Sequence, residues 1–162
     1  MMVLLAATAI FGMPAMAQGV TPRLDLFTAE KIVSGCRAHA AVKHQSHAIA
    51  VYDVGGNPVM AVRTDGNSPG AMAFASEKAK AAALWGFATS GMADAAIETP
   101  GFARAPFVVT VAGGVPVYAA DGQTLIGGVG ASGEAPADDE SCVNAGIAAA
   151  GLLPRRKSNA GP

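Results

Sequence analysis

Short turn signals between apolar runs constrain the fold of this chain more than any other feature of its sequence. In the last third, the apolar runs FVVTVA, VPVYA and LIGGVGA are separated by Gly113-Gly114 and by Asp121-Gly122, dipeptides that favour two-residue hairpin turns. Further upstream, two apolar runs at 48–54 and 58–64 flank the sequence Gly-Gly-Asn. Connections this short join antiparallel strands, because parallel strands need a crossover of a dozen or more residues. The sequence therefore predicts a mostly antiparallel sheet of five strands.

Helical patterns flank these strands and complete the predicted fold. Helices are expected over about residues 29–44, 69–86 and 90–97, and from Asp138 to about Leu153. Thr28 is the predicted N-cap of the first helix, and Ser68 before Pro69 marks the start of the second. The two upstream strands do not alternate apolar and polar residues, so both their faces are expected to be covered, by helices or by another subunit. The predicted class is α/β (α+β), a central mostly antiparallel five-stranded sheet flanked by helices.

Gly128, Gly130 and Gly133 have the G-x-G-x-x-G spacing of a dinucleotide-binding turn. That motif needs a crossover helix and a second parallel strand after it, with an acidic residue about 20 positions further on. Here one helix and a tail follow, and the helix begins with the run Asp138-Asp139-Glu140, which repels a phosphate. NAD or FAD is therefore not expected. The glycines are predicted to let neighbouring backbone, or a ligand, approach the strand closely.

The first 17 residues have the layout of a secretory signal peptide. An apolar run extends from Val3 to Met13, and Ala15-Met16-Ala17 fits the A-x-A cleavage pattern. The run is too short to span a bilayer, so no stable membrane insertion is expected. Cleavage after Ala17 would make the protein periplasmic or secreted, with one domain over 18–153 and a flexible basic tail over 154–162. The alternative is an N-terminal buried helix.

The charge balance and the two cysteines narrow the possible classes further. With 11 Lys and Arg against 12 Asp and Glu, the chain has no excess of cations for displacing counterions, and no nucleic-acid partner is expected. Cys36 and Cys142 both lie in predicted helices. An exported protein permits a disulfide between them, which would close a loop of roughly 100 residues. Two buried free thiols are the alternative, and the sequence leaves both open.

Four stretches occur in the order IAVYDVGGNPVMAVRTDG, SEKAKAAA, AGGVPVYAADGQTLIGGVGASG and DDESC. Together they resemble the GlcG/HbpS-type family, also called the haem-degrading-domain family, over about residues 26–152. The resemblance implies a profilin-like fold with a central antiparallel sheet, and assembly into homo-oligomers. It also implies haem as a possible cofactor, since members of the family are linked to haem binding, to extracytoplasmic redox sensing and to corrinoid metabolism.

Several residues that match the family's motifs, or end a predicted strand or begin a helix, are candidates for ligand contact. They are Arg63, Asp65, Lys78, Gly114, Pro116, Ser132, Gly133 and Asp139. Each has a structural alternative, such as a turn at Asp65 or compensation of the helix dipole at Asp139. Lys78 shares a predicted helix face with Phe74, and its ammonium is expected near the Arg63–Asp65 turn or in an intersubunit pocket.

The remaining polar residues do not form a recognisable catalytic or metal-binding set. His39, His44 and His47 have no second ligand at ligand spacing and are expected to be solvated or locally hydrogen bonded. The favoured function is an exported protein that binds a small molecule, haem or a related tetrapyrrole or acidic ligand, as a carrier or sensor. The alternatives are an enzyme of haem degradation or of small hydroxy-acid or carbonyl catabolism, and an oligomeric accessory protein for a membrane sensor.

Overall fold

The computed structural model describes residues 22–158, so the expected signal peptide at 1–17 lies outside the described residues, as do residues 159–162. The elements along the chain are α1 (Leu26–Lys43), β1 (Ala48–Asp53), β2 (Pro58–Arg63), α2 (Pro69–Trp85), α3 (Thr89–Glu98), a short 3₁₀ helix (Phe102–Arg104), β3 (Gly114–Tyr118), β4 (Leu125–Ser132) and α4 (Pro136–Ala149). Within residues 22–158, none of the helices combines the length and the hydrophobicity that a bilayer span requires.

The strands form one antiparallel sheet in the order β2-β1-β4-β3. The prediction of five strands is wrong, because the run at 107–112 forms no strand and has Phe107 in the left-handed region, at φ 61°. A fifth strand would pair with the edge of β3 that faces away from β4, where Pro116 has no N–H to donate to a ladder. Gly113, at φ 116°, leads the chain into β3 and does not form the predicted hairpin turn with Gly114.

The predicted turn at Asp121-Gly122 is present in the connection between β3 and β4. Gly122 adopts φ 72°, a left-handed conformation that suits glycine. The Asp121 carboxylate accepts a hydrogen bond from the Thr124 hydroxyl at 2.6 Å and further ones from backbone N–H groups of the turn. These hydrogen bonds, the Thr124 hydroxyl first, lower the pKa of Asp121 to about 2.

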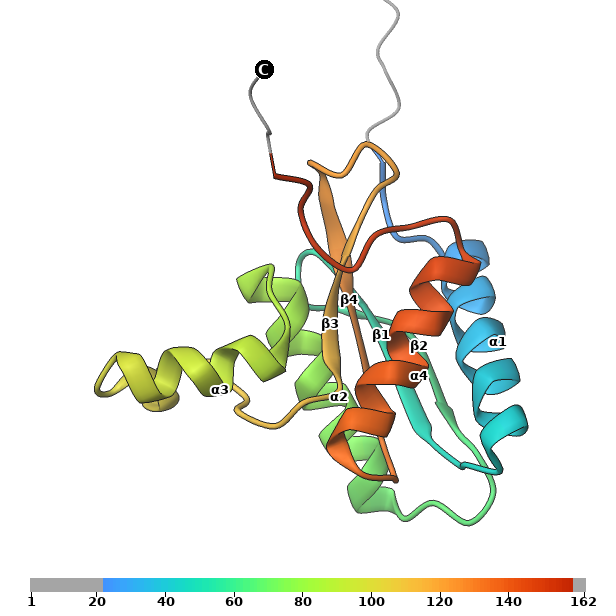
Figure 1. Cartoon of the computed structure of the whole chain (residues 1–162). Helices are drawn as coiled ribbons and strands as arrows, with labels where there is room; N and C mark the ends of the chain where they lie inside the picture. Colours follow the sequence, from blue (N-terminus) through green and yellow to red (C-terminus); the bar gives the residue numbers. More distant parts are fainter. Residues whose placement is uncertain (1–21, 159–162) are drawn as a thin grey trace, which may run out of the picture.

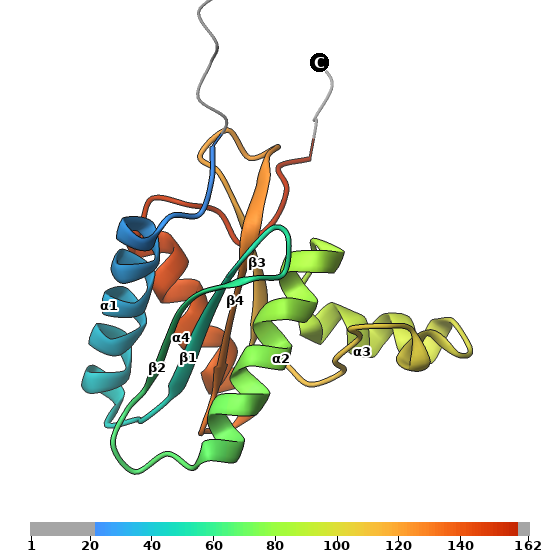
Figure 2. The same ribbon diagram turned by 180° about the vertical axis from the view of Figure 1, so that it is seen from behind.

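Helices cover both faces of the sheet, as Figure 1 and Figure 2 show. α1 and α4 lie side by side on one face, α2 lies on the other, and α3 extends away from the sheet. In β1, Ile49 and Val51 pack in the larger core with α1 and α4, whereas Ala48 and Ala50 pack against α2. None of these side chains is more than 1 % exposed. The predicted cover of both faces is therefore confirmed for β1, by helices of the same chain, and is wrong for β2, whose residues are exposed or half-buried.

The glycines of the G-x-G-x-x-G stretch let α2 approach β4. A Cβ at Gly128 would lie 2.5 Å from the Ala79 carbonyl oxygen, and a Cβ at Gly130 would overlap the carbonyl oxygen of Ala75. Close approach of backbone, one of the two predicted roles, therefore accounts for these glycines. β4 runs antiparallel to both of its neighbours, and the chain passes from Gly133 into α4.

Gly130→Ala is expected to lower the free energy of unfolding by about 1–3 kcal/mol, because the added methyl group forces α2 away from β4. Urea unfolding followed by circular dichroism measures this loss. Gly70→Ala, within α2, is the matched control, because the added Cβ would lie at an ordinary contact distance of 3.6 Å from Ser68 Oγ. Alanine also favours a helix by roughly 0.5–1 kcal/mol over glycine, so this variant is not expected to lose stability. Equal unfolding midpoints for the two variants would contradict the close packing of α2 on β4.

The ends of the helices follow from local capping. α1 begins at Leu26 with Asp25 as its N-cap, and not at the predicted Thr28. The Asp25 carboxylate accepts a hydrogen bond from Thr28 N–H at 2.9 Å. Hydrogen bonds from Thr28, that of its side chain first, lower the pKa of Asp25. The prediction for α2 is confirmed, with Ser68 as the N-cap and Gly86 in the left-handed conformation at the end.

The residues after α4 are held along the edge of β3. Leu153 exchanges two backbone hydrogen bonds with Tyr118, at 2.8 and 3.0 Å. Lys157 N–H donates to the Gly122 carbonyl oxygen at 2.8 Å. Residues 153–157 therefore contact the folded domain, and the flexibility that the sequence predicted over 154–162 stays a prediction.

Cys36 in α1 and Cys142 in α4 form a disulfide, with their Cα atoms 4.6 Å apart. Of the two alternatives that the sequence left open, the structure has the bridge, and both cysteines are fully buried. Gly35 and Gly146 let the two helices come this close, because a Cβ at Gly35 would lie 2.5 Å from the Ala149 methyl group.

Candidate functional site

Lys78 and Asp139 form a buried ion pair between α2 and α4, and His47, just before β1, joins it to make a buried polar cluster. The Asp139 carboxylate accepts a hydrogen bond from Lys78 Nζ at 3.0 Å through Oδ2, and its Oδ1 lies 3.0 Å from His47 Nδ1. Lys78 Nζ also donates to the Ala131 carbonyl oxygen at 3.0 Å. The three side chains are only 1–2 % exposed. Charges buried this deeply depend on one another, because each needs its partner in place of water.

Two neighbours shape this cluster. A Cβ at Gly113 would lie 2.8 Å from both Lys78 Nζ and Asp139 Cβ, so glycine leaves the room that the ion pair occupies. Lys78 Nζ lies 4.7 Å from the ring centroid of Phe74, which the sequence placed on the same face of the helix. Of the two places predicted for the ammonium, the Arg63–Asp65 turn is wrong, because Asp139 holds Lys78 Nζ. The intersubunit pocket stays a prediction.

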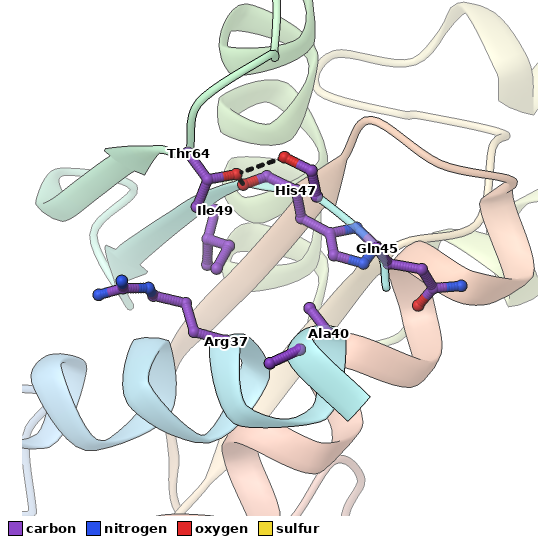
Figure 3. Close-up of a pocket in the computed structure, with 8 residues that line it drawn as sticks. Arg37, Ala40, Gln45, His47, Ile49 and Thr64 are labelled. Atoms are coloured by element: carbon purple, nitrogen blue, oxygen red, sulfur yellow. Dashed lines mark hydrogen bonds between the residues drawn. The ribbon is translucent and has the colours of Figure 1, made fainter. Parts of the chain in front are cut away.

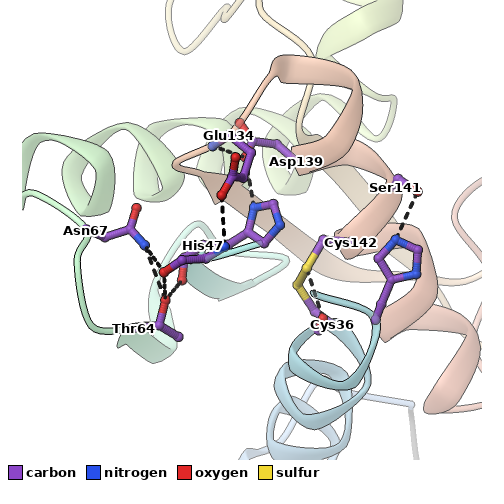
Figure 4. The surroundings of a disulfide bond; sticks show 10 residues. Cys36, His47, Thr64, Asn67, Glu134, Asp139, Ser141 and Cys142 are labelled. Atoms are coloured by element: carbon purple, nitrogen blue, oxygen red, sulfur yellow. Dashed lines mark hydrogen bonds and ion pairs between the residues drawn. A yellow bond between two sulfur atoms is a disulfide. The ribbon is translucent and has the colours of Figure 1, made fainter. Parts of the chain in front are cut away.

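A chain of hydrogen bonds connects the cluster to the turn after β2 (Figure 4). Glu134 N–H donates to Asp139 Oδ1 at 3.2 Å, and Glu134 Oε1 accepts from Ser46 N–H at 2.9 Å. The Ser46 hydroxyl donates to the backbone carbonyl oxygen of Asp65 at 2.9 Å. Asp65 therefore takes part in this network through its backbone.

Arg63 and Gly133 lie at the same end of the sheet. Arg63 Nη1 donates to the Asn67 carbonyl oxygen, and Asn67 Nδ2 donates to Ser46 Oγ at 2.8 Å. Gly133 has φ 142°, and a Cβ there would lie 2.6 Å from the Ser46 carbonyl oxygen. Four of the sequence candidates, Arg63, Asp65, Lys78 and Asp139, belong to this hydrogen-bond network, and Ser132 and Gly133 lie beside it at the end of β4. We call the region formed by these six residues the polar junction. Their direct contact with a ligand stays a prediction.

Gly114 and Pro116 lie in β3, outside the polar junction. Gly114 N–H donates to Thr89 Oγ1 at 2.9 Å, which fixes the start of α3 against the strand. A Cβ at Gly114 would overlap the Lys78 carbonyl oxygen, so this glycine lets β3 approach α2. Pro116 pairs with Gly128 in the sheet and lines a groove on the outer side of β3.

That groove has a volume of about 800 Å³ and follows the outer edge of β3, where Tyr118 pairs with Leu153. Its walls come from the α2–α3 connection, from β3, from α4 and from the segment after α4. The residues that characterise it are Phe87, Val115, Pro116, Tyr118, Arg155 and Arg156, and we call it the β3 groove. Its volume falls in the range of about 300–1,000 Å³ that is usual for small-molecule sites.

Two arginines and Tyr118, together with Glu140 and Asn144 of α4, give the β3 groove its polar character. The Tyr118 hydroxyl donates to the Gly86 carbonyl oxygen at 2.8 Å, which fixes the ring. The Arg156 guanidinium carbon lies 6.0 Å from the centroid of that ring. Sequence reasoning missed Arg155 and Arg156 because they follow Pro154 in what is predicted to be a tail. The only available signal was two adjacent cations in a chain with few charges.

A smaller cavity of about 170 Å³ lies between the C-terminal half of α1 and the β1–β2 side of the sheet (Figure 3). Arg37, Gln45 and His47 are among its lining residues. Of the other histidines, His39 Nε2 lies 3.3 Å from Ser141 Oγ, and His44 is exposed at the end of α1. Across residues 22–158, no cluster of three or more His, Cys, Asp or Glu side chains is arranged to hold a metal ion.

The antiparallel sheet between helices, with a groove along its edge strand, defines a small α/β domain, and comparison with known proteins identifies its family. The model of the family described as haem degrading protein, HbpS-like, matches residues 24–148. Because this match covers most of the sequence, the chain belongs to the HbpS-like family. No curated protein matched the sequence.

Solved structures share this fold. The crystal structure of HbpS is 28 % identical and has a TM-score of 0.72, over 87 % of this chain and 97 % of that one. A doubly substituted HbpS from Streptomyces reticuli gives the same identity and TM-score over 88 % and 97 %. The structure of a PduOC:haem complex, at 22 % identity and a TM-score of 0.73 over 83 % and 99 %, is similar in fold alone. The match to the family model confirms the family that the sequence motifs predicted, and the solved structures confirm the fold.

Proposed function

We propose that this chain is an exported protein that binds haem, or a related tetrapyrrole with acidic side groups, in the β3 groove and serves as a carrier or sensor. The observation that carries the proposal is the composition of that groove. It offers about 800 Å³ next to apolar side chains, with Arg155 and Arg156 along its length. Membership of a family described as haem degrading, and a fold shared with a PduOC:haem complex, support the choice of ligand.

The residues of the groove suit such a ligand. A tetrapyrrole is flat and apolar, and its propionate carboxylates are anionic. Pro116 and Phe87 would contact the ring, while the two guanidinium groups would donate paired hydrogen bonds to the propionates. When bound, haem would supply a redox-active iron, which suits a sensor as well as a carrier.

Removal of both guanidinium groups is expected to weaken haemin binding about tenfold. Two charge-assisted hydrogen-bonding groups at an exposed rim contribute about 1–2 kcal/mol in total. The measurement is a titration with haemin, followed by the Soret band, on wild type and on Arg155→Gln, Arg156→Gln. Arg104→Gln in the 3₁₀ helix is the matched control, because it removes an exposed arginine outside the groove.

A second variant tests the apolar part of the same site. Ala88 lines the groove, so the larger side chain of Ala88→Trp is expected to fill it and abolish saturable binding. Ala88 is the N-cap of α3 but makes no side-chain capping hydrogen bond, so the substitution removes no cap. Wild-type titration curves in both variants would refute the groove as the site. Loss of the Soret band with formation of an open-chain product, when a reductant and oxygen are added, would favour the enzymatic alternative.

Export and self-association complete the proposal. The signal-peptide layout of residues 1–17 and the Cys36–Cys142 disulfide support a periplasmic or secreted location. Ile97 on the projecting α3 is 83 % exposed and Phe107 is 49 % exposed, which supports cover by a second copy of the chain. Native mass spectrometry is expected to show more than one copy per particle, and a single copy at micromolar concentration would contradict self-association.

A further inference from the structure

The β3 groove has charges of opposite sign at its two ends. Arg155 and Arg156 lie at one end, and the Arg156 guanidinium carbon is 6.0 Å from the ring centroid of Tyr118, the last residue of β3. Glu140 of α4 lines the same groove. Within residues 22–158, no cation forms an ion pair with Glu140, and no carboxylate forms one with either arginine. The groove therefore has an electrostatic direction as well as a shape.

Hydrogen bonds place Glu140 near the first residue of β3, at the end opposite the arginines. Glu140 Oε1 accepts from the Ser90 hydroxyl at 3.0 Å. The residue before Ser90 is Thr89, whose Oγ1 accepts from the N–H of Gly114, the first residue of β3, at 2.9 Å. Gly114 and Tyr118 are the two ends of an extended strand of five residues, so about 13 Å separates them. The carboxylate and the guanidinium groups therefore lie on opposite sides of a ligand that spans the groove.

The Glu140 carboxylate acts on such a ligand through its charge and not by direct contact. Its Oε2 atom is buried and has no hydrogen-bond partner in the described part of the chain, and its Oε1 atom holds Ser90. α4 contains no Lys or Arg, and Asn144, one turn further along this helix, contributes a neutral amide to the groove wall. Because a partly buried charge without a counter-cation is weakly screened, a second anion at this end of the groove is disfavoured.

This arrangement distinguishes tetrapyrroles by where their carboxylates lie. Protoporphyrin IX has both propionates on one half of the macrocycle and uncharged vinyl groups on the other half. When its propionates meet Arg155 and Arg156, the vinyl groups face Glu140. Coproporphyrin III differs only in having propionates in place of the two vinyl groups. In each orientation that brings propionates to the arginines, other propionates are therefore brought towards Glu140.

We propose that Glu140 makes the β3 groove selective for tetrapyrroles whose carboxylates all lie on one half of the ring. This inference rests on the haem site proposed above and deepens it, because it names the residue that rejects related ligands. Arg155 and Arg156 attract the carboxylate half, and Glu140 repels carboxylates from the other. Selectivity of this kind is a difference between two affinities, and a repulsive group contributes to it as much as an attractive one. The same repulsion orients a bound porphyrin in the groove.

The test compares three metal-free porphyrins, each titrated into wild type. Binding is followed by the Soret band and by quenching of Trp85, the only tryptophan of the chain. Mesoporphyrin IX, which has ethyl groups in place of the vinyl groups, is the uncharged control for protoporphyrin IX. These two are expected to bind with similar Kd values. Coproporphyrin III is expected to bind at least about tenfold more weakly, because its additional carboxylates meet a like charge.

Two variants assign the selectivity to one side chain. Glu140→Gln removes the charge and keeps an acceptor for Ser90, so it is expected to tighten coproporphyrin III binding about tenfold and to leave protoporphyrin IX binding nearly unchanged. Asp138→Asn is the matched control, because it removes a carboxylate of the same helix that does not line the groove. It is expected to leave the ratio of the two Kd values as in wild type.

The outcomes separate this inference from the haem site on which it rests. Equal affinities of wild type for all three porphyrins would overturn the selectivity and leave the site in place. So would a ratio of Kd values that is the same in Glu140→Gln and in wild type. Failure of all three porphyrins to bind would overturn the site itself, and the role of Glu140 with it.

Discussion

Asp139→Ala is expected to lower the free energy of unfolding by about 3–5 kcal/mol, because it leaves Lys78 buried with no counter-charge. Lys78 is 1 % exposed, and its ammonium cannot turn to water without opening the contact between α2 and β4. The same substitution removes the partner of His47 Nδ1 and the acceptor for Glu134 N–H. Urea unfolding at neutral pH measures the loss as a lower midpoint with an unchanged slope.

The neighbouring residue provides the control for this substitution. Asp138 lies one position away in the first turn of α4, and its carboxylate is 3.9 Å from Lys43 Nζ. The side chains of Asp138 and Lys43 are 39 % and 43 % exposed. Such a surface pair contributes about 0–1 kcal/mol, so Asp138→Ala is expected to be nearly neutral. If the two variants unfold at the same urea concentration, the buried cluster does not hold the helices as described.

Loss of the disulfide is expected to destabilise the fold by about 4–5 kcal/mol. Cys36 and Cys142 are separated by 106 residues, and in the chain-entropy model a loop of roughly 100 residues gives about 4.7 kcal/mol. The bridge joins α1 to α4, so without it the unfolded chain gains freedom over most of the domain. Comparison of urea unfolding for wild type and for Cys36→Ala, Cys142→Ala measures the effect.

A reductant provides the control for that measurement. Wild type is expected to lose the same stability when reduced under denaturing conditions and refolded with reductant, and the double alanine variant is expected to be insensitive to reductant. An intact mass under non-reducing conditions that corresponds to two free thiols would show that the bridge does not form.

The sequence predicted those parts of the fold that local rules determine. Ser68-Pro69 starts α2 and Asp121-Gly122 turns the chain between β3 and β4, because capping and turn formation depend on adjacent residues. The run at 107–112 shows the limit of this reasoning. Its residues favour a strand, but a strand needs a partner, and Pro116 interrupts the edge that is available.

The candidate site shows the same limit at the level of side chains. Lys78 and Asp139 were each recognisable as unusual, but their pairing joins α2 to α4 across 61 positions, and nothing local specifies it. His47 joins the same carboxylate from 92 positions away. Arg155 and Arg156 face the β3 groove only because Leu153 and Lys157 fix the backbone on either side of them. The family, in contrast, was predictable, because several motifs in a fixed order carry it.

Mapping of a bound porphyrin by NMR tests the central claim most directly. Gallium protoporphyrin IX, a diamagnetic analogue of haemin, would be titrated into ¹⁵N-labelled protein. The account predicts that the largest amide shifts fall on the non-proline residues that line the β3 groove, which include residues 86–88, Val115, Tyr118, Leu153, Arg155 and Arg156. Shifts centred instead on Arg63–Asn67 and Ser132–Glu134, with the resonances of the groove unchanged, would contradict the proposed site. They would place the ligand at the polar junction.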